Sequence, residues 1–440
     1  MPVSKRRKKR PTRRHGPHAG PPSFDAPGIP PIDGLVRSVL RGARELLEVE
    51  DPFEAELWAS QVLGVFYKLP LPLPARDELE RSIGPAIVEG AERKGDAAGV
   101  AILLALGAVD REGIGPAASA GAERLVRSGV PEPVWAAKIG RPGLVDAWVL
   151  EDPYGDQQAY YATFHYPGRD PHTLMALYDE NLGGIIKDGF AGYPKDRNAP
   201  RRRAEAEPRA QVADADPGVM AARITQAIEM GDRYLDNEWT PEFKKVRALL
   251  FSRMRLLPAA ALPEPPPLDE EGRGALTAEF LASPYAPALD EAAAIVGHCL
   301  DARCDYGDGE PLRWSPIVVE LFMLDYLPRK AFLTAGEIRA LPEVLGGWVR
   351  FALTKRGLEE RWIAETEEAV EEFAPEFRRA VTDPGSFGPA KAMANAMLAS
   401  GVDLTDRRAV DAWIAEFNAR PDEERDQLLG AFPMPDDRGE

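Results

Sequence analysis

Apolar residues recur at helical spacing through most of this chain, and that periodicity constrains its fold more than any other feature. After Asp33, for example, Val36, Val39 and Leu40 return every three or four positions, as in the buried stripe of an amphipathic helix. The pattern predicts a helical domain over residues 32–140. Its helices are expected at about 33–47, 53–66, 77–93, 96–108 and 115–128.

Local capping signals mark where helices begin and end. Asp51, Pro52 and Glu54 have the order of a helix start, with an N-cap, a proline at the first helical position and an acid at the third. The proline-rich stretch from Leu69 to Ala75 is predicted to be non-helical. The same signals predict a second helical domain over residues 217–432. Its helices are expected at about 217–235, 241–256, 286–303, 316–326, 335–356, 358–381, 388–400 and 406–419.

A different pattern separates the two helical regions. Residues 144–150 and 157–166 are rich in β-branched and aromatic side chains, and the six residues between them have turn chemistry. A third such run at 172–178 completes an antiparallel meander, and a short helix is expected at 185–190. The fold class is therefore mainly α with a small α+β module, residues 141–191, in the middle of the chain. Residues 192–216 are polar and contain proline, which predicts a linker or long loop.

Charge is distributed very unevenly along the chain. Residues 1–31 are basic and then rich in Pro and Gly, which predicts a disordered tail. The tail cations are Lys5, Arg6, Arg7, Lys8, Lys9, Arg10, Arg13 and Arg14. Without these eight, the remaining Lys and Arg number 46 against 71 acidic residues, a formal charge of −25. A cationic arm on an acidic body is expected to contact nucleic acid or another polyanion, or else to be a solubilising or self-associating segment. Residues 433–440 are expected to fray at the C-terminus.

Cysteine usage and hydropathy indicate the compartment. The two cysteines, Cys299 and Cys304, make no disulfide framework. The longest apolar runs fall well short of the roughly 18 residues that suggest a membrane span. We therefore expect a cytoplasmic protein without membrane association.

Histidines in the predicted meander are the first candidates for chemistry. His165 and His172 flank one turn, and strand alternation is expected to place both on one face with Asp170 or Asp152, where a divalent metal would find ligands. The alternative is that both are ordinary residues beside a turn. No phosphate loop, dinucleotide fingerprint or zinc-protease motif occurs in the sequence, so no cofactor is predicted, and a divalent metal is the one alternative kept open.

The segment His298-Cys299-Leu300-Asp301-Ala302-Arg303-Cys304 is the second candidate. His298, Cys299 and Cys304 are potential metal ligands, but their spacing is incomplete and no partner pair occurs elsewhere. Cys299 also fits the apolar face of a helix, where a free thiol behaves as a small hydrophobe.

The third candidate is DENLGGIIKDGF, residues 179–190. Its two adjacent glycines would let backbone amides approach a phosphate or carboxylate, and Lys187 would supply a cation. Asp179 and neighbouring acids could alternatively gather around a divalent cation. A short basic corner at residues 327–330 could also touch an anion or a partner.

The stretch 314–353 predicts a helical core built on aromatic side chains. These are Phe322, Tyr326, Phe332, Trp348 and Phe351, which recur at near-helical spacing. We interpret them as core rather than as a cofactor site.

Two blocks, DPYGDQQAYYATFHYPGRDPHTLMALYDENLGGIIKDGF and WSPIVVELFMLDYLPRK, resemble segments of a hypothetical-protein family from high-GC actinobacteria. The resemblance covers about half of the chain and implies no activity or catalytic residue. The sequence therefore favours a non-enzymatic binding or regulatory protein with a basic tail for a polyanion and a further, unspecified protein partner. The alternative is a metal-assisted hydrolase or transferase whose site lies on residues 144–190, with His165, His172, Asp179 and Lys187 as its candidate residues.

Overall fold

The computed structural model describes residues 32–65, 73–110, 113–194, 198–233, 239–258, 260–262, 267–421 and 424–425. These residues form two compact units. The predictions for the tail at 1–31 and for the C-terminal residues 433–440 lie outside the described ranges. The predicted fold class is confirmed, because the chain is mainly helical and one antiparallel sheet lies in its middle.

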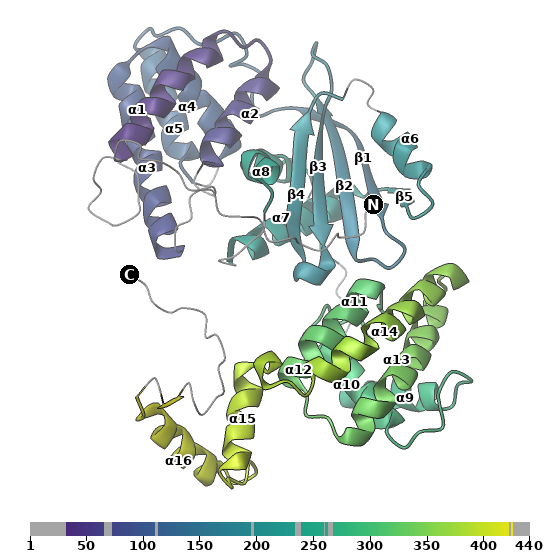
Figure 1. Ribbon diagram of the computed structural model, residues 1–440. Helices are drawn as coiled ribbons and strands as arrows, with labels where there is room; N and C mark the ends of the chain where they lie inside the picture. Colours follow the sequence, from purple (N-terminus) through teal and green to yellow (C-terminus); the bar gives the residue numbers. More distant parts are fainter. Residues whose placement is uncertain are drawn as a thin grey trace, which may run out of the picture. The chain divides into compact units, whose positions relative to one another are not determined.

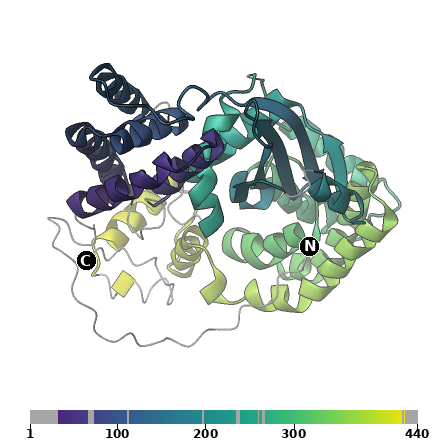
Figure 2. The same ribbon diagram turned by 90° about the horizontal axis from the view of Figure 1, so that it is seen from above.

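The first unit is a bundle of helices from the N-terminal part of the chain. Its elements are α1 (Ile32–Gly42), a 3-10 turn (Ala43–Leu47), α2 (Pro52–Leu63), α3 (Leu73–Lys94), α4 (Ala97–Val109) and α5 (Gly115–Arg127). Both ribbon views show α1 to α5 gathered together (Figures 1 and 2). The sequence of α4 carries no charge and nearly all of its residues are buried, so this helix forms the centre of the bundle. Segments 166–169 and 244–252 also belong to this unit.

Helix α3 corrects one prediction. It begins at Leu73, inside the stretch that was expected to be non-helical. Pro74 stands in the first turn, where an amide has no intrahelical partner and a proline therefore costs nothing. The proline-rich stretch thus leads directly into a helix.

The second unit contains the sheet. Its strands are β1 (Gly143–Glu151), β2 (Gln157–His165), β3 (His172–Asp179), β4 (Ile185–Gly192) and β5 (Gln211–Asp214). Their order is β4-β3-β2-β1-β5, and every neighbouring pair is antiparallel (Figure 1). The predicted meander of three strands is therefore present and is extended at both edges.

Both added strands overturn predictions. Residues 185–190, expected to be a short helix, form β4, which pairs with β3 along almost its whole length. The expected linker at 192–216 instead contains α6 (Ala199–Glu205) and β5, and β5 pairs with β1 from Trp148 to Glu151. Strand pairing decided both cases: β4 pairs with β3, its neighbour in the chain, and β5 pairs with the more distant β1.

The helices of the second half belong to the same compact unit as the sheet, except for residues 244–252, which belong to the first unit. They are α7 (Pro217–Arg233), α8 (Pro241–Met254), α9 (Glu270–Leu281), α10 (Ala292–Cys304), α11 (Pro316–Glu320), α12 (Leu327–Lys330), α13 (Ala335–Lys355), α14 (Glu360–Ala380), α15 (Pro389–Ala399) and α16 (Arg407–Asn418). Helix α7 packs on β4 and β3 (Figure 1). The expected separate domain at 217–432 is therefore not separate, and α9 was not predicted. A π-helical turn, Leu321–Tyr326, interrupts the helix expected at 316–326.

The aromatic core predicted for this region is confirmed in part. Phe322, Trp348 and Phe351 are buried in a large cluster that draws on α10, α11, α13 and α14. Phe332, in contrast, is 50% exposed, and Tyr326 is only half-buried. Among the described helices, none combines the length and apolar character that crossing a membrane needs.

Candidate functional site

A pocket of about 560 Å³ lies within the second unit. Its walls come from the end of β3 and the turn after it, from α7, from the end of α10 and the loop that follows, and from the segment α11 to α12. Four cations line it, Arg223, Arg303, Arg313 and Lys330, and we call it the arginine pocket.

The turn after β3 forms one wall through local sequence. Asp179 is buried and accepts hydrogen bonds from the Leu182 amide at 3.2 Å and from Lys187 Nζ at 2.8 Å. Gly183 and Gly184 follow with φ values of 83° and 74°, a left-handed conformation that favours glycine. Both glycines line the pocket. Asp179 therefore holds a tight turn in place and presents the glycine pair to the cavity.

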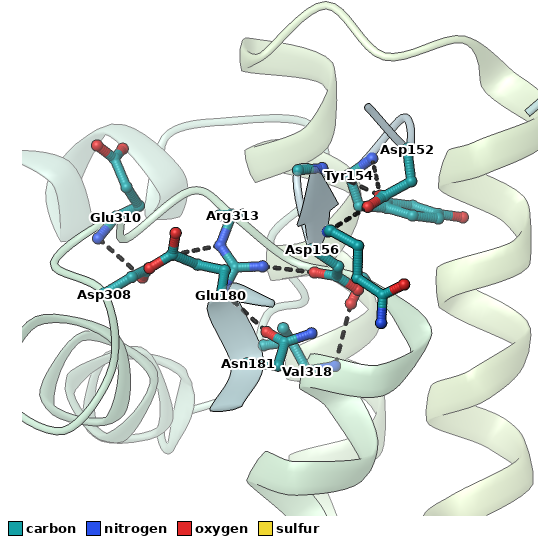
Figure 3. A network of polar contacts seen from close by, with 12 residues as sticks. Asp152, Tyr154, Asp156, Glu180, Asn181, Asp308, Glu310, Arg313 and Val318 are labelled. Carbon is teal, nitrogen blue, oxygen red and sulfur yellow. Dashed lines mark hydrogen bonds and ion pairs between the residues drawn. The ribbon is translucent and has the colours of Figure 1, made fainter. Parts of the chain in front are cut away.

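A buried ion-pair network forms another part of the wall (Figure 3). Arg313 donates to the carboxylates of Asp156 and Asp308, and to Asn181 Oδ1 at 2.9 Å. Arg303 donates to the same Asp308 carboxylate. The side chains of Arg303, Arg313 and Asp308 are 9%, 6% and 5% exposed, so one desolvated carboxylate serves two desolvated guanidinium groups.

Short sequence signals position the members of this network. Asp152 accepts from the backbone amides of Tyr154 at 2.9 Å and Gly155 at 3.1 Å, which closes the β1–β2 turn just before Asp156. Ser315 caps α11 by accepting from the Val318 amide at 3.1 Å, two residues after Arg313. Asp156 and Arg313, which form an ion pair, thus each lie beside a well-defined turn or helix cap.

The two guanidinium groups of the network are not equally compensated. Burial lowers the pKa of Arg303, and neighbouring Arg313 adds to this effect while Asp308 opposes it. Burial also opposes the charged form of Arg313, but Asp308 and Asp156 outweigh it and raise the pKa of that group. Arg303 is therefore the member with the least compensation, and its Nε has no hydrogen-bond partner among the described residues.

The other two cations of the pocket have no carboxylate partner in the described part of the chain. Arg223 Nη1 lies 3.4 Å from the Tyr178 hydroxyl, and its guanidinium stacks over the Tyr178 ring at 5.3 Å. Lys330 Nζ lies 3.5 Å from the centroid of the Tyr306 ring. Burial opposes the charged form of Arg223, but Tyr178, Tyr160 and the Glu180 carboxylate outweigh it and raise the pKa of this group. Both cations remain able to pair with an incoming anion.

The aromatic side of the pocket is built on the π-helical turn. Phe322 and Tyr326 both belong to this turn and line the cavity. Their rings stack with centroids 5.8 Å apart, and the centroids of the Tyr326 and Tyr306 rings lie 5.5 Å apart. π-Helical turns are rare and occur frequently at functional sites.

The two meander histidines do not converge, contrary to expectation. His172 pairs directly with Phe164 across the β2–β3 ladder and stacks on its ring, so these two side chains share one face. His165 follows Phe164 and points to the opposite face, where it is exposed. Asp152, the expected carboxylate partner, is engaged in the β1–β2 turn.

The cysteine cluster does not form a ligand set either. Cys299 is fully buried in the helical core, where burial raises the pKa of its thiol, and Cys304 is half-buried at the end of α10. His298 Nε2 lies 3.9 Å from a Glu337 carboxylate oxygen. Throughout the described ranges, no group of three or more His, Cys, Asp or Glu side chains is arranged to hold a metal ion.

Part of the site was anticipated and part was missed. The glycine pair was a candidate anion site, and the basic corner at residues 327–330 a candidate contact for an anion or a partner; Gly183, Gly184 and Lys330 all line the pocket. Lys187 was expected to supply the cation there, but it pairs with Asp179. The cations come instead from Arg223, Arg303 and Arg313, which no sequence motif marked. The tail cations, from Lys5 to Arg14, lie outside the described residues.

Comparisons with protein-family models, with curated proteins and with solved structures found no match to this chain.

Removing the shared carboxylate should destabilise the second unit. Asp308→Asn leaves two buried guanidinium groups with one carboxylate, and breaking such a buried pair costs about 3–5 kcal/mol. Asp305→Asn, in the same loop but with a side chain 47% exposed, is the matched control and should cost less than about 1 kcal/mol. Urea unfolding followed by tryptophan fluorescence would measure both. Equal losses for the two variants would contradict the network's structural role.

The buried histidine predicts a dependence of stability on pH. Burial, reinforced by Arg253, lowers the pKa of His172 from 6.5 to about 3, so the unfolded chain binds this proton more readily than the folded one. Stability should therefore fall as pH drops below 6.5, by about 2 kcal/mol between pH 7 and pH 5 from this group alone. In urea unfolding at the two pH values, His172→Gln should lose less stability on acidification than the wild type does. His165→Gln is the control for a histidine on the exposed face, and an unchanged pH dependence in His172→Gln would refute the assignment.

Proposed function

We propose that this protein is a non-enzymatic binding protein whose ligand is a small anion held in the arginine pocket. One observation carries the proposal: Arg223 and Lys330 line the cavity with no carboxylate partner among the described residues, beside two arginines that share Asp308. Arg223 and Lys330 thus have donor capacity that an anion would use.

Two of the four cations, Arg303 and Arg313, are paired with buried carboxylates, whereas Arg223 and Lys330 form no ion pair among the described residues. Asp308 is committed to Arg303 and Arg313. Asp325 pairs with Arg329, and Glu180 accepts from the Tyr178 hydroxyl at 2.7 Å. Guanidinium groups are suited to carboxylate and phosphate oxygens because their donors form a planar fork. The volume of the pocket also lies in the range of about 300–1,000 Å³ that is usual for small-molecule sites.

The alternative of a metal-assisted hydrolase or transferase on residues 144–190 receives less support. Its four candidate side chains have separate roles: His172 is buried against Phe164, His165 is exposed on the other face, and Asp179 pairs with Lys187. They do not meet around one point where a substrate could react. We retain the cytoplasm as the proposed location, supported by the two free thiols, which suit a reducing compartment.

Binding of pyrophosphate and citrate to the full chain, measured by isothermal titration calorimetry, tests the proposal. We expect binding of at least one probe, weakened about tenfold or more by Arg223→Gln, since a hydrogen bond to a charged group contributes about 1.5–3 kcal/mol. The control Arg127→Gln removes an arginine that is 73% exposed in the first unit and should leave affinity unchanged. Both variants keep the basic tail, so their difference reports on the pocket. Equal binding by the three proteins would overturn the proposal, and so would a failure to bind any of the small anions, aromatic or not, that are titrated against the full chain.

We also propose that the basic tail contacts nucleic acid or another polyanion and thereby brings the protein to a further partner. The support is compositional: eight cations and no acid in residues 1–14, attached to a chain that otherwise carries a formal charge of −25.

Deletion of residues 1–22 tests the role of the tail. We expect the full chain to bind duplex DNA or RNA with an affinity that falls steeply as salt rises, because binding releases condensed counterions. The truncated protein should lose this binding while it keeps its response to small anions in calorimetry. Nucleic-acid binding that survives the deletion would contradict the proposed role of the tail.

A further inference from the structure

We infer that the ligand of the arginine pocket is a planar aromatic anion, whose ring stacks on Tyr306 while its anionic group pairs with the pocket's cations. This inference rests on the proposed function and specifies the chemical class of its ligand. It follows from the aromatic side chains that line the pocket, which the binding of a small anion alone does not explain.

Tyr306 is the exposed aromatic side chain of the pocket. It lines the pocket and is 62% exposed, so much of its side chain is accessible. It stands in the loop after α10, ahead of Gly307 and Gly309, and Gly309 has a φ of 81°. The ring is thus presented at the cavity by a loop and contributes little to the core.

Tyr306 packs against two further aromatic rings, which connect it to the buried core. Phe322 is 3% exposed and stacks on Tyr326 with an interplanar angle of 14°, and Tyr326 contacts Tyr306 in turn. Phe322 also meets Trp314 edge to face, with ring centroids 5.3 Å apart. The result is a row of rings that runs from the buried core to the exposed Tyr306, and such a platform suits another flat ring.

The π-helical turn is an independent sign that this row is functional. Phe322 and Tyr326 are four residues apart, and the turn that contains both departs from regular α-helical hydrogen bonding. Such turns carry a cost in stability, and they are frequent where side chains must be placed for a ligand.

Lys330 links the aromatic and charged parts of the site. Its ammonium lies over the Tyr306 ring, and the side chain is exposed and carries no ion pair among the described residues. A cation over an exposed ring is held more weakly than one in a charge-assisted hydrogen bond. An aromatic anion can therefore replace the ammonium on the ring and take the same ammonium as a partner for its anionic group.

The test compares ligands that differ by a ring, using the full chain in calorimetry. Adenosine monophosphate is paired with ribose 5-phosphate, and 4-hydroxybenzoate is paired with acetate, so the two arms distinguish a phosphate from a carboxylate. We expect the ring-bearing member of at least one pair to bind tenfold or more tightly. Tyr306→Leu should remove that advantage without changing the affinity for the ring-free member. Phe190→Leu, which alters a phenyl group 51% exposed on β4, is the matched control and should keep the advantage.

The outcomes separate this inference from the proposal beneath it. Ring-bearing and ring-free probes that bind equally, or a Tyr306→Leu variant that keeps the advantage, would overturn the aromatic class and leave anion binding intact. Failure of all four probes, together with pyrophosphate and citrate, would overturn the anion-binding function itself.

Discussion

The second unit depends on one carboxylate that serves two buried guanidinium groups. Asp308 binds Arg303 and Arg313, and Arg313 continues to Asp156 in the β1–β2 turn (Figure 3). Removing charges from water is costly, and the cost is recovered only if every partner is in place with good geometry. The network therefore joins the sheet to the loop before α11 in one arrangement. Tyr154 strengthens the same junction, since its hydroxyl donates to the Trp362 carbonyl at 3.1 Å.

Because the ion-pair network is buried, the pocket has a fixed part and an exposed part. The side chains of Arg303 and Arg313 are almost completely buried and are held by carboxylates, so they form a fixed charged floor. Lys330 and Tyr306 are exposed at the rim, where the ammonium lies over the Tyr306 ring and Tyr326 contacts the same ring. A fixed charged floor supplies preorganisation, and an exposed rim can adjust to a ligand, which together favour selective binding.

Sequence reasoning succeeded where the signal was local. The turn chemistry of residues 151–156 and the alternating runs on either side predicted the β1–β2 hairpin. It failed where the conformation of a segment depended on the strand it pairs with. β4 was expected to be a helix and β5 a linker, because neither has a pattern that is independent of the strand it pairs with. The histidines were expected on one face. His172 pairs with Phe164, the residue before His165, so the alternation of side chains along β2 places the two histidines on opposite faces.

What the sequence determined by itself is the class of the fold, most helix positions, the hairpin and the polarity between a basic tail and an acidic remainder. These follow from periodicity, caps, turn residues and charge, all of which act over a few positions along the chain. Only the tertiary structure decided the site. Arg223, Arg303, Arg313 and Lys330 come from four separate elements and carry no common motif. Their meaning depends on which charges are desolvated and which acids reach them, and those are properties of three-dimensional packing.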